Sequence, residues 1–239
     1  ILTPTNYSAS KRTDLLPGFM GSLYQGEAAM HYMLAGLEAG SSFAIFTEVG
    51  DAKKWDDLKV VYMGPAATPT KVLYIQSKHG YERDSYVLPG NFYNKSGKAS
   101  KKVDGIVLTG NTDVFTLPMY FDDWFQLVED KKIDASITEM VLFSNRLINS
   151  SVPGFVDCFS KDTHKLTDDF IEGTGIYQKM LNITLAEKEQ IDFRNNLFQS
   201  LLNNTCLKNF TWLQEGKYEK IKSFLRIIEF RLGQKYIDD

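Results

Sequence analysis

Trp55-Asp56-Asp57-Leu58-Lys59-Val60-Val61-Tyr62 places two acids directly before a short apolar strand at 58–62, and Lys71-Val72-Leu73-Tyr74-Ile75-Gln76-Ser77-Lys78 contains a second strand, 71–76, with a Gln-x-Lys at its end. Both stretches are rich in β-branched and aromatic residues, as strands are. Side chains alternate along a strand, so Gln76 and Lys78 point to the same face. If the two strands form a hairpin, Asp57 meets that pair at one end of the sheet.

The residues before these strands predict a helix and one further strand. Residues 21–39 carry apolar side chains at helical spacing, with Ser22 as the expected N-cap and Gly40 as the stop signal. Residues 43–47 are short and apolar and predict the first strand. The expected order is therefore helix, strand, strand, strand, with short connections.

The later chain continues the α/β pattern and then becomes helical. The expected elements are an exposed lysine-bearing insertion at 80–105, strands at 106–108 and 137–144, and a helix at 119–128. Beyond Pro153, Thr184 and Glu187 predict a capping box, and residues 218–232 carry one apolar helical face. We expect an α/β core at 18–150 and a helical region at 151–239, either accessory or packed on the core.

Composition bounds the class of protein. The chain has 239 residues, 43% hydrophobic and 24% charged, with a net charge of −3 and two cysteines far apart in sequence. This favours an intracellular globular protein in a reducing compartment and argues against a disulfide framework or zinc site. No apolar run approaches the roughly 20 residues of a membrane span, and no secretion signal is apparent. The absence of an initiator Met leads us to expect further domains of a longer chain.

The residues around Asp57 have the chemistry of a hard-metal site. The Asp57 carboxylate, the Gln76 amide oxygen and the Ser77 backbone carbonyl are oxygen donors of the kind that Mg²⁺ prefers. Lys78 can position or deprotonate an attacking water and stabilise charge on a phosphate. The pattern therefore predicts metal-assisted phosphodiester chemistry.

This constellation resembles the PD-(D/E)xK nuclease superfamily, and specifically its Mrr-like branch, in which Gln replaces the usual acid of the last motif. It also looks like the nuclease domain that opens some antiviral effectors. The motifs that carry the resemblance are Gly18-Phe19, Tyr24-Gln25, Glu48, Asp56-Asp57, Gln76-Ser77-Lys78 and, more loosely, the strand ending Leu142-Phe143-Ser144-Asn145.

The resemblance implies a restriction-endonuclease-like core, a mixed β-sheet flanked by helices. It also implies Mg²⁺ or Mn²⁺ as cofactor, DNA as substrate, and a homodimer or higher oligomer with a role in defence or as a toxin. Glu27 sits where family members often carry an acid in the first helix, and Glu48 is a second assisting acid. Asp57 is favoured over Asp56 as the metal ligand, because the family's Asp usually stands directly before the apolar strand. Gln25, Asp56 and His79 are the candidate substrate contacts.

Each of these residues also fits a purely structural role. Asp56 or Asp57 can end a turn before a strand, and Glu27 and Lys78 can be solvated surface residues. The lysines at 95–102 can follow a DNA backbone or lie in a solvated loop. The Gln76 substitution and the acidic balance keep a second hypothesis open. In that hypothesis, a degenerate nuclease fold binds protein or nucleic acid without cleaving it.

Overall fold

The computed structural model describes nine stretches of the chain, and the account below concerns these residues: 15–50, 52–79, 86–93, 99–103, 106–110, 116–160, 165–173, 184–208 and 214–233. The lysine-bearing positions 95 and 98 lie outside them.

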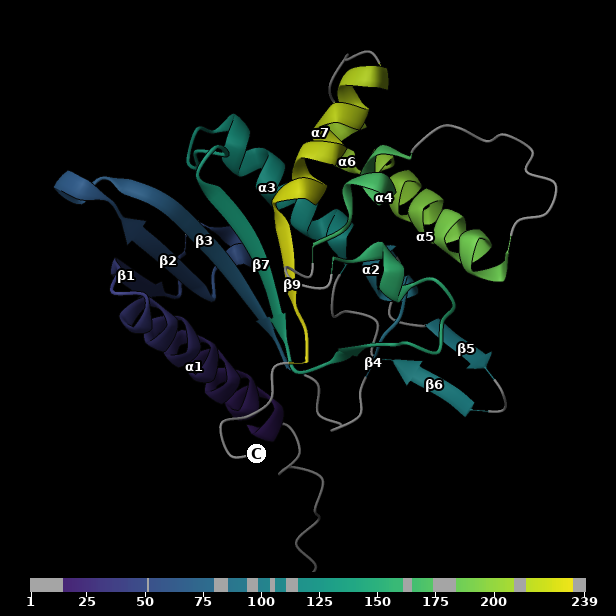
Figure 1. The fold of residues 1–239 in the computed structure, drawn as a ribbon, viewed down its shortest axis with the longest axis horizontal. Helices are drawn as coiled ribbons and strands as arrows, with labels where there is room; N and C mark the ends of the chain where they lie inside the picture. The colour runs from purple at the N-terminus through teal and green to yellow at the C-terminus, as the bar shows by residue number, and fades with distance from the viewer. Residues whose placement is uncertain are drawn as a thin grey trace, which may run out of the picture.

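A mixed five-stranded sheet is the centre of the fold (Figure 1). Its order is β1-β2-β3-β7-β9; the first three strands are antiparallel neighbours, whereas β7 is parallel to both β3 and β9. The strands are β1 (Ser42–Thr47), β2 (Leu58–Met63), β3 (Pro69–Lys78), β7 (Thr138–Ser144) and β9 (Ile228–Arg231). The strands expected at 43–47, 58–62, 71–76 and 137–144 are confirmed.

One face of the sheet is covered by α1 (Leu15–Glu38), as Figure 1 shows. Tyr24, Ala28 and Tyr32 of this helix pack on side chains that alternate along β2 and β3, including Leu58 and Ile75. The helix stops where Gly40 adopts a φ of +59°, as expected from the sequence. It begins well before residue 21, however, so Ser22 lies inside the helix and the prediction that it is the N-cap was wrong.

The opposite face carries the other helices. They are α2 (Gly90–Tyr93), α3 (Leu117–Glu129), α4 (Asp168–Glu172), α5 (Leu185–Leu202), α6 (Thr205–Lys208) and α7 (Gln214–Ile227). Their apolar side chains form one continuous core with the alternate residues Val72 and Tyr74 of β3. The helical region beyond residue 150 therefore packs directly on the sheet.

The insertion expected to be exposed at 80–105 is partly buried. Val87 and Phe92 are fully buried, and the Phe92 ring packs on Phe155, Phe159, Phe193 and Phe230. An apolar pair surrounded by polar residues is easily mistaken for loop, but these two side chains enter the main core. Two short strand pairs complete this region: β4 (Tyr86–Val87) pairs with β8 (Leu147–Ile148), and β5 (Ala99–Val103) pairs with β6 (Ile106–Gly110). Elsewhere, η3 (Pro65–Ala67) connects β2 to β3, and η4 (Val156–Cys158) follows β8.

The last predicted helix, 218–232, is also wrong at its end. The helix α7 stops at Ile227 and β9 follows at once, pairing with β7 through Met140↔Ile228. Ile228, Phe230 and Leu232 are buried, and they alternate as strand residues do. The backbone of β7 pairs with these residues along its edge. A helical spacing of apolar residues in the sequence does not reveal that this edge is available.

Both cysteines, Cys158 and Cys206, are free and buried, in agreement with the expectation of no disulfide framework. No helix in the described stretches is long and apolar enough to cross a membrane.

The capping box at the start of α5 is confirmed. The Thr184 hydroxyl accepts from the Glu187 N–H at 3.2 Å, and the Glu187 carboxylate accepts from the Thr184 N–H at 2.7 Å. We predict that Thr184→Ala lowers the melting temperature by about 2–4 °C, the usual consequence of a lost N-cap in a chain of this size. Thr184→Ser should retain most of the stability. A thermal melt in which Thr184→Ala matches the exposed control Lys188→Ala would contradict this reading.

Candidate functional site

Asp57 lies at the end of the β2–β3 hairpin, where the sequence predicted it. The register Leu58↔Ile75 brings Asp57 opposite Gln76. One Asp57 carboxylate oxygen, Oδ2, accepts from the Ser77 N–H at 2.7 Å and from the Gln76 side-chain amide at 2.5 Å. The three residues predicted to supply metal ligands are therefore in direct contact.

The Gln76 side chain is buried and presents its amide nitrogen, rather than its oxygen, to Asp57. Rotation of the amide about its last torsion angle would turn the oxygen toward Asp57 instead. The Ser77 N–H points to the β2 side of β3, and in a strand the C=O of a residue points to the same side as its N–H. The Ser77 carbonyl is thus directed to the β2 side of β3, the side from which Asp57 comes.

The Asp57 carboxyl group is costly to ionise. Its pKa is raised to about 6, chiefly by burial and to a lesser extent by the nearby carboxylates of Asp56 and Glu48. The Ser77 hydrogen bond and the positive charge of Lys78 act in the opposite direction and lower the pKa. A carboxyl group held in this state gains stability from a bound cation, which relieves both the burial and the repulsion.

Gln25 connects α1 to this corner of the sheet. Its side-chain amide nitrogen donates to the Asp57 backbone carbonyl at 2.8 Å and to the Glu48 carboxylate at 3.2 Å. Glu48 is exposed and has a φ of +50°, a left-handed conformation that non-glycine residues rarely adopt. Gln25 therefore orients the strand end and Glu48 together, and its expected contact with substrate stays a prediction.

Glu27 and His79 lie on the α1 side of the sheet. The His79 ring packs against Tyr24 at 5.3 Å between ring centroids, and the Glu27 charge together with burial raises the pKa of Tyr24. His79 thus points away from the face of Lys78, as the alternation along β3 predicts. Burial and, less strongly, the charge of Arg146 lower the pKa of His79.

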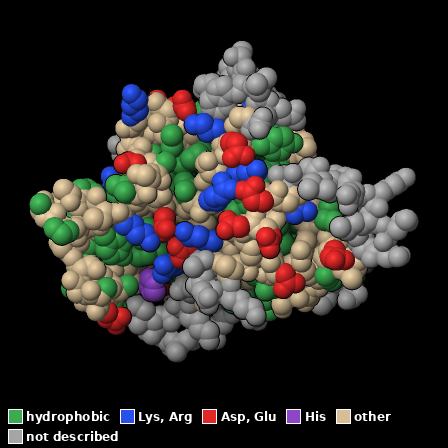
Figure 2. All heavy atoms as spheres, turned by 45° about the horizontal axis from the view of Figure 1, so that its top comes forward, with side chains coloured by type: hydrophobic (Ala, Val, Ile, Leu, Met, Phe, Trp, Pro, Cys, Tyr) green, Lys and Arg blue, Asp and Glu red, His purple; other side chains and the backbone are tan. Residues whose placement is uncertain are grey.

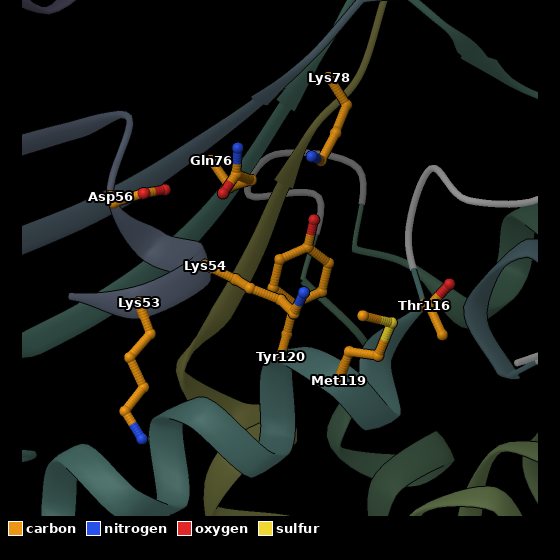
Figure 3. Close-up of a pocket in the computed structure, with 8 residues that line it drawn as sticks. All are labelled: Lys53, Lys54, Asp56, Gln76, Lys78, Thr116, Met119 and Tyr120. Carbon is orange, nitrogen blue, oxygen red and sulfur yellow. The ribbon is translucent and has the colours of Figure 1, made fainter. Parts of the chain in front are cut away.

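A cleft of about 510 Å³ opens on the other face, between the end of β3 and α3 (Figure 3). Lys78, Gln76 and Asp56 line it from the sheet side. The remaining lining residues were not identified from the sequence; they are Lys53, Lys54, Thr116, Met119 and Tyr120. Asp56 borders this open cleft, whereas Asp57 lies at the hydrogen-bonded end of the strand.

Tyr120 is the most informative of the residues missed by sequence reasoning. Its hydroxyl points into the cleft toward the side from which Lys78 enters (Figure 3). Burial raises the pKa of Tyr120 well above its usual range, with further contributions from the charges of Asp57, Asp123 and Asp56, so the hydroxyl remains a proton donor. Nothing in the apolar run of α3 distinguishes this tyrosine from a core aromatic.

The buried Trp55 joins the acidic turn to α3. It lies in the short helix η2 (Lys53–Trp55), its indole N–H donates to the Tyr120 carbonyl at 3.3 Å, and the two rings are 4.8 Å apart. Lys53, in the same turn, donates to Gln126 of α3, and Figure 3 shows its side chain directed away from the cleft. Lys54 and Lys78 are the cations left facing the cleft among its described lining.

The donor set at Asp57 fits a divalent cation that keeps several water ligands. Among the described residues, no group of three or more His, Cys, Asp or Glu side chains is arranged to hold a metal ion. Mg²⁺, however, is commonly bound through one or two carboxylates plus waters and substrate phosphates. Asp57, the Ser77 carbonyl and the Gln76 amide after rotation satisfy that requirement.

The surface charge is mixed. Figure 2 shows lysine and arginine side chains interspersed with acidic ones on the face that it presents. A polyanionic ligand on this face would thus depend on local contacts, in keeping with the net charge of −3.

No family model matches this sequence, and no curated protein matches it either.

The raised pKa of Asp57 makes a prediction about stability. A folded-state pKa of about 6, above the ordinary value, means that Asp57 contributes stability below pH 4 that is lost as the pH rises through 6. Asp57→Asn cannot ionise. In EDTA, we expect its stability relative to the parent to increase between pH 4 and pH 8 by on the order of 1–2 kcal/mol, after allowing for partial exposure.

Urea unfolding at both pH values measures this difference. Asp130→Asn, an exposed position in the described α3–β7 connection, is the matched control and should show no such change. If the difference in unfolding free energy between Asp57→Asn and the parent stays constant from pH 4 to pH 8, the pKa of Asp57 is not raised.

Proposed function

We propose that this chain is a metal-dependent endonuclease domain that cleaves DNA phosphodiester bonds, with Asp57, Gln76, Ser77 and Lys78 at its centre. The observation that carries the proposal is the contact of the Asp57 carboxylate with both Gln76 and Ser77 at the end of the hairpin. This contact lies beside a cleft that Lys78 lines. A buried acid beside oxygen donors and a lysine is suited to phosphoryl chemistry.

The order of elements supports a restriction-endonuclease-like core of the PD-(D/E)xK type. A helix precedes three antiparallel strands, the acid opens the second strand, and Gln-x-Lys ends the third. The helix α3 and the parallel strand β7 then follow. This order agrees with the resemblance drawn from the sequence motifs.

Asp57 would be the principal ligand of Mg²⁺ or Mn²⁺, with the Ser77 carbonyl and the Gln76 amide oxygen as further donors. The metal, when bound, activates a water molecule and neutralises charge on the scissile phosphate. Glu48 lies at the same strand end and would assist through outer-shell water, held in place by Gln25. Glu27 belongs with Tyr24 on the other face, and we assign it a supporting role.

The other groups of the cleft act on the phosphate. The Lys78 ammonium enters from the end of β3 and stabilises the negative charge that develops as the attacking water adds. Tyr120 remains protonated and donates a hydrogen bond to a non-bridging phosphate oxygen. Lys54 borders the cleft on the opposite side from Lys78 and holds the neighbouring phosphate.

DNA as the substrate, and a defence or toxin role as part of a larger protein, rest on the resemblance to effector nucleases. The cleft lining supports a phosphate-bearing ligand, since two lysines and a tyrosine hydroxyl converge there.

Plasmid cleavage tests the proposal. We predict that the parent chain converts supercoiled plasmid to nicked and linear forms with Mg²⁺ or Mn²⁺, and that EDTA stops the reaction. Asp57→Ala and Lys78→Ala should each lower the rate by at least about 100-fold, because each removes charge that acts in the transition state. Asp130→Ala and Lys132→Ala, exposed residues beyond α3, are the matched controls and should cleave like the parent. Cleavage that survives in both site variants would place the activity elsewhere.

A second prediction concerns Tyr120. Removing a hydrogen bond to a charged group costs about 1.5–3 kcal/mol, so Tyr120→Phe should lower kcat/KM for plasmid or oligonucleotide cleavage by about 10- to 100-fold. Tyr93→Phe, in α2 away from the cleft, is the control for loss of a tyrosine hydroxyl. Equal rates for the two variants would remove Tyr120 from the proposed machinery.

The orientation of Gln76 favours one alternative function. Its amide nitrogen faces Asp57, and a glutamine supplies no negative charge, so a degenerate fold that binds nucleic acid or protein without cleaving it also suits this strand end. Such a module would retain nucleic-acid or protein binding in EDTA and in Lys78→Ala. A nuclease loses turnover in both.

A further inference from the structure

The outward face of α1 is apolar. Leu23, Met30, Met33, Leu34 and Leu37 are between 40% and 62% exposed, while Tyr24, Ala28 and Tyr32 fill the inward face. We refer to the five exposed residues as the α1 stripe. A helix that covers a sheet normally carries polar residues on its outer side. Among residues 21–38, the only exposed charged residue is Glu38, at the end of the helix.

The α1 stripe has the spacing of a helix–helix seam. Leu23, Met30 and Leu37 recur every seven residues, and Met33 and Leu34 lie three and four residues beyond Met30. In heptad notation, Leu23, Met30 and Leu37 are successive a positions, and Met33 and Leu34 are a d and an e position. This is the arrangement that packs one helix against another. Gly26 occupies the remaining d position, and no heavy atom of the described structure lies within 4 Å of a Cβ built there. A second backbone can therefore approach closely at that point.

We propose that the α1 stripe packs against the α1 stripe of a second copy of this chain, antiparallel about a two-fold axis near Met30. The five stripe residues, each at least 40% exposed, together present an apolar area on the order of several hundred Å², at the level where patches on monomers are often functional. Two copies that face each other along this stripe, with the small Gly26 at its d position, would bury an area approaching the roughly 1,000 Å² of the smallest specific interfaces. A self-complementary stripe meets the requirement of an isologous contact.

The stripe runs about 21 Å along the helix, from Leu23 to Leu37. A matching partner must present a contiguous apolar surface of that length, and the α1 stripe of a second copy does so.

The contact would bring two candidate sites into one dimer, because Gln25 at the start of the stripe is hydrogen-bonded to the Asp57 carbonyl. The dimer itself does not rest on the proposed function, since its evidence lies entirely on α1. It is therefore tested without nucleic acid or metal.

Sedimentation equilibrium of the parent, from about 1 to 200 µM, is expected to give a monomer–dimer equilibrium with a Kd in the micromolar range. Leu37→Glu and the milder Leu34→Gln should weaken dimerisation at least tenfold without lowering the melting temperature at a protein concentration well below the parent's Kd, where the parent is monomeric. Leu185→Glu is the matched control, because Leu185 is 63% exposed and Leu37 is 62% exposed. Leu185→Glu should associate like the parent.

Oxidative cross-linking tests the geometry. Met30→Cys should form a disulfide-linked dimer, whereas Leu185→Cys should not; the native Cys158 and Cys206 are buried. A parent that stays monomeric at 200 µM, or stripe variants that dimerise like the parent, would overturn the proposal. Stripe variants that lower the melting temperature of a monomeric parent would also overturn it, because the stripe would then be covered by the chain itself.

Discussion

The register of the β2–β3 hairpin determines where the candidate catalytic groups lie. Leu58 pairs with Ile75, and both side chains are buried under α1, so a slip of one residue would turn one of them to the opposite face and bring its neighbours under α1. With the register held by this burial, Asp57 must stand opposite Gln76 and beside the Ser77 N–H. The same alternation sends Lys78 to the cleft and His79 to Tyr24. The packing of this hairpin under α1 therefore also fixes the positions of the candidate catalytic groups on the opposite face.

The folded chain pays a cost in free energy for the position of Asp57. Burial and two neighbouring carboxylates disfavour its charge, and the Ser77 hydrogen bond and the Lys78 charge only partly compensate. Trp55 holds the acidic turn against α3, so the turn does not relax away from the hydrogen-bonded corner. An unfavourable charge kept in place by a rigid surrounding is typical of functional sites, where stability is given up for activity. A cation would remove most of that penalty.

The hairpin and the contact among Asp57, Gln76 and Ser77 could be predicted from sequence, because strand alternation and a short connection leave little freedom. Tyr120 could not be, since it arrives from a helix that packs beside the hairpin only in the folded chain. The end of α7 was ambiguous for a related reason. Residues 221–228 satisfy a helical period, and only pairing with β7 favours a strand beyond it. The burial of Phe92 likewise depends on distant aromatic partners.

Metal binding at Asp57 is the central claim, and a Mn²⁺ titration followed by water-proton relaxation tests it most directly. The parent chain at pH 8 should bind Mn²⁺ at a site that Mg²⁺ competes for. Because Asp57 must lose its proton to bind, affinity should fall as the pH drops below about 6. Asp57→Asn should lose the site while remaining folded. Binding that is equal in the parent and Asp57→Asn, or that does not change between pH 5 and pH 8, would contradict the account.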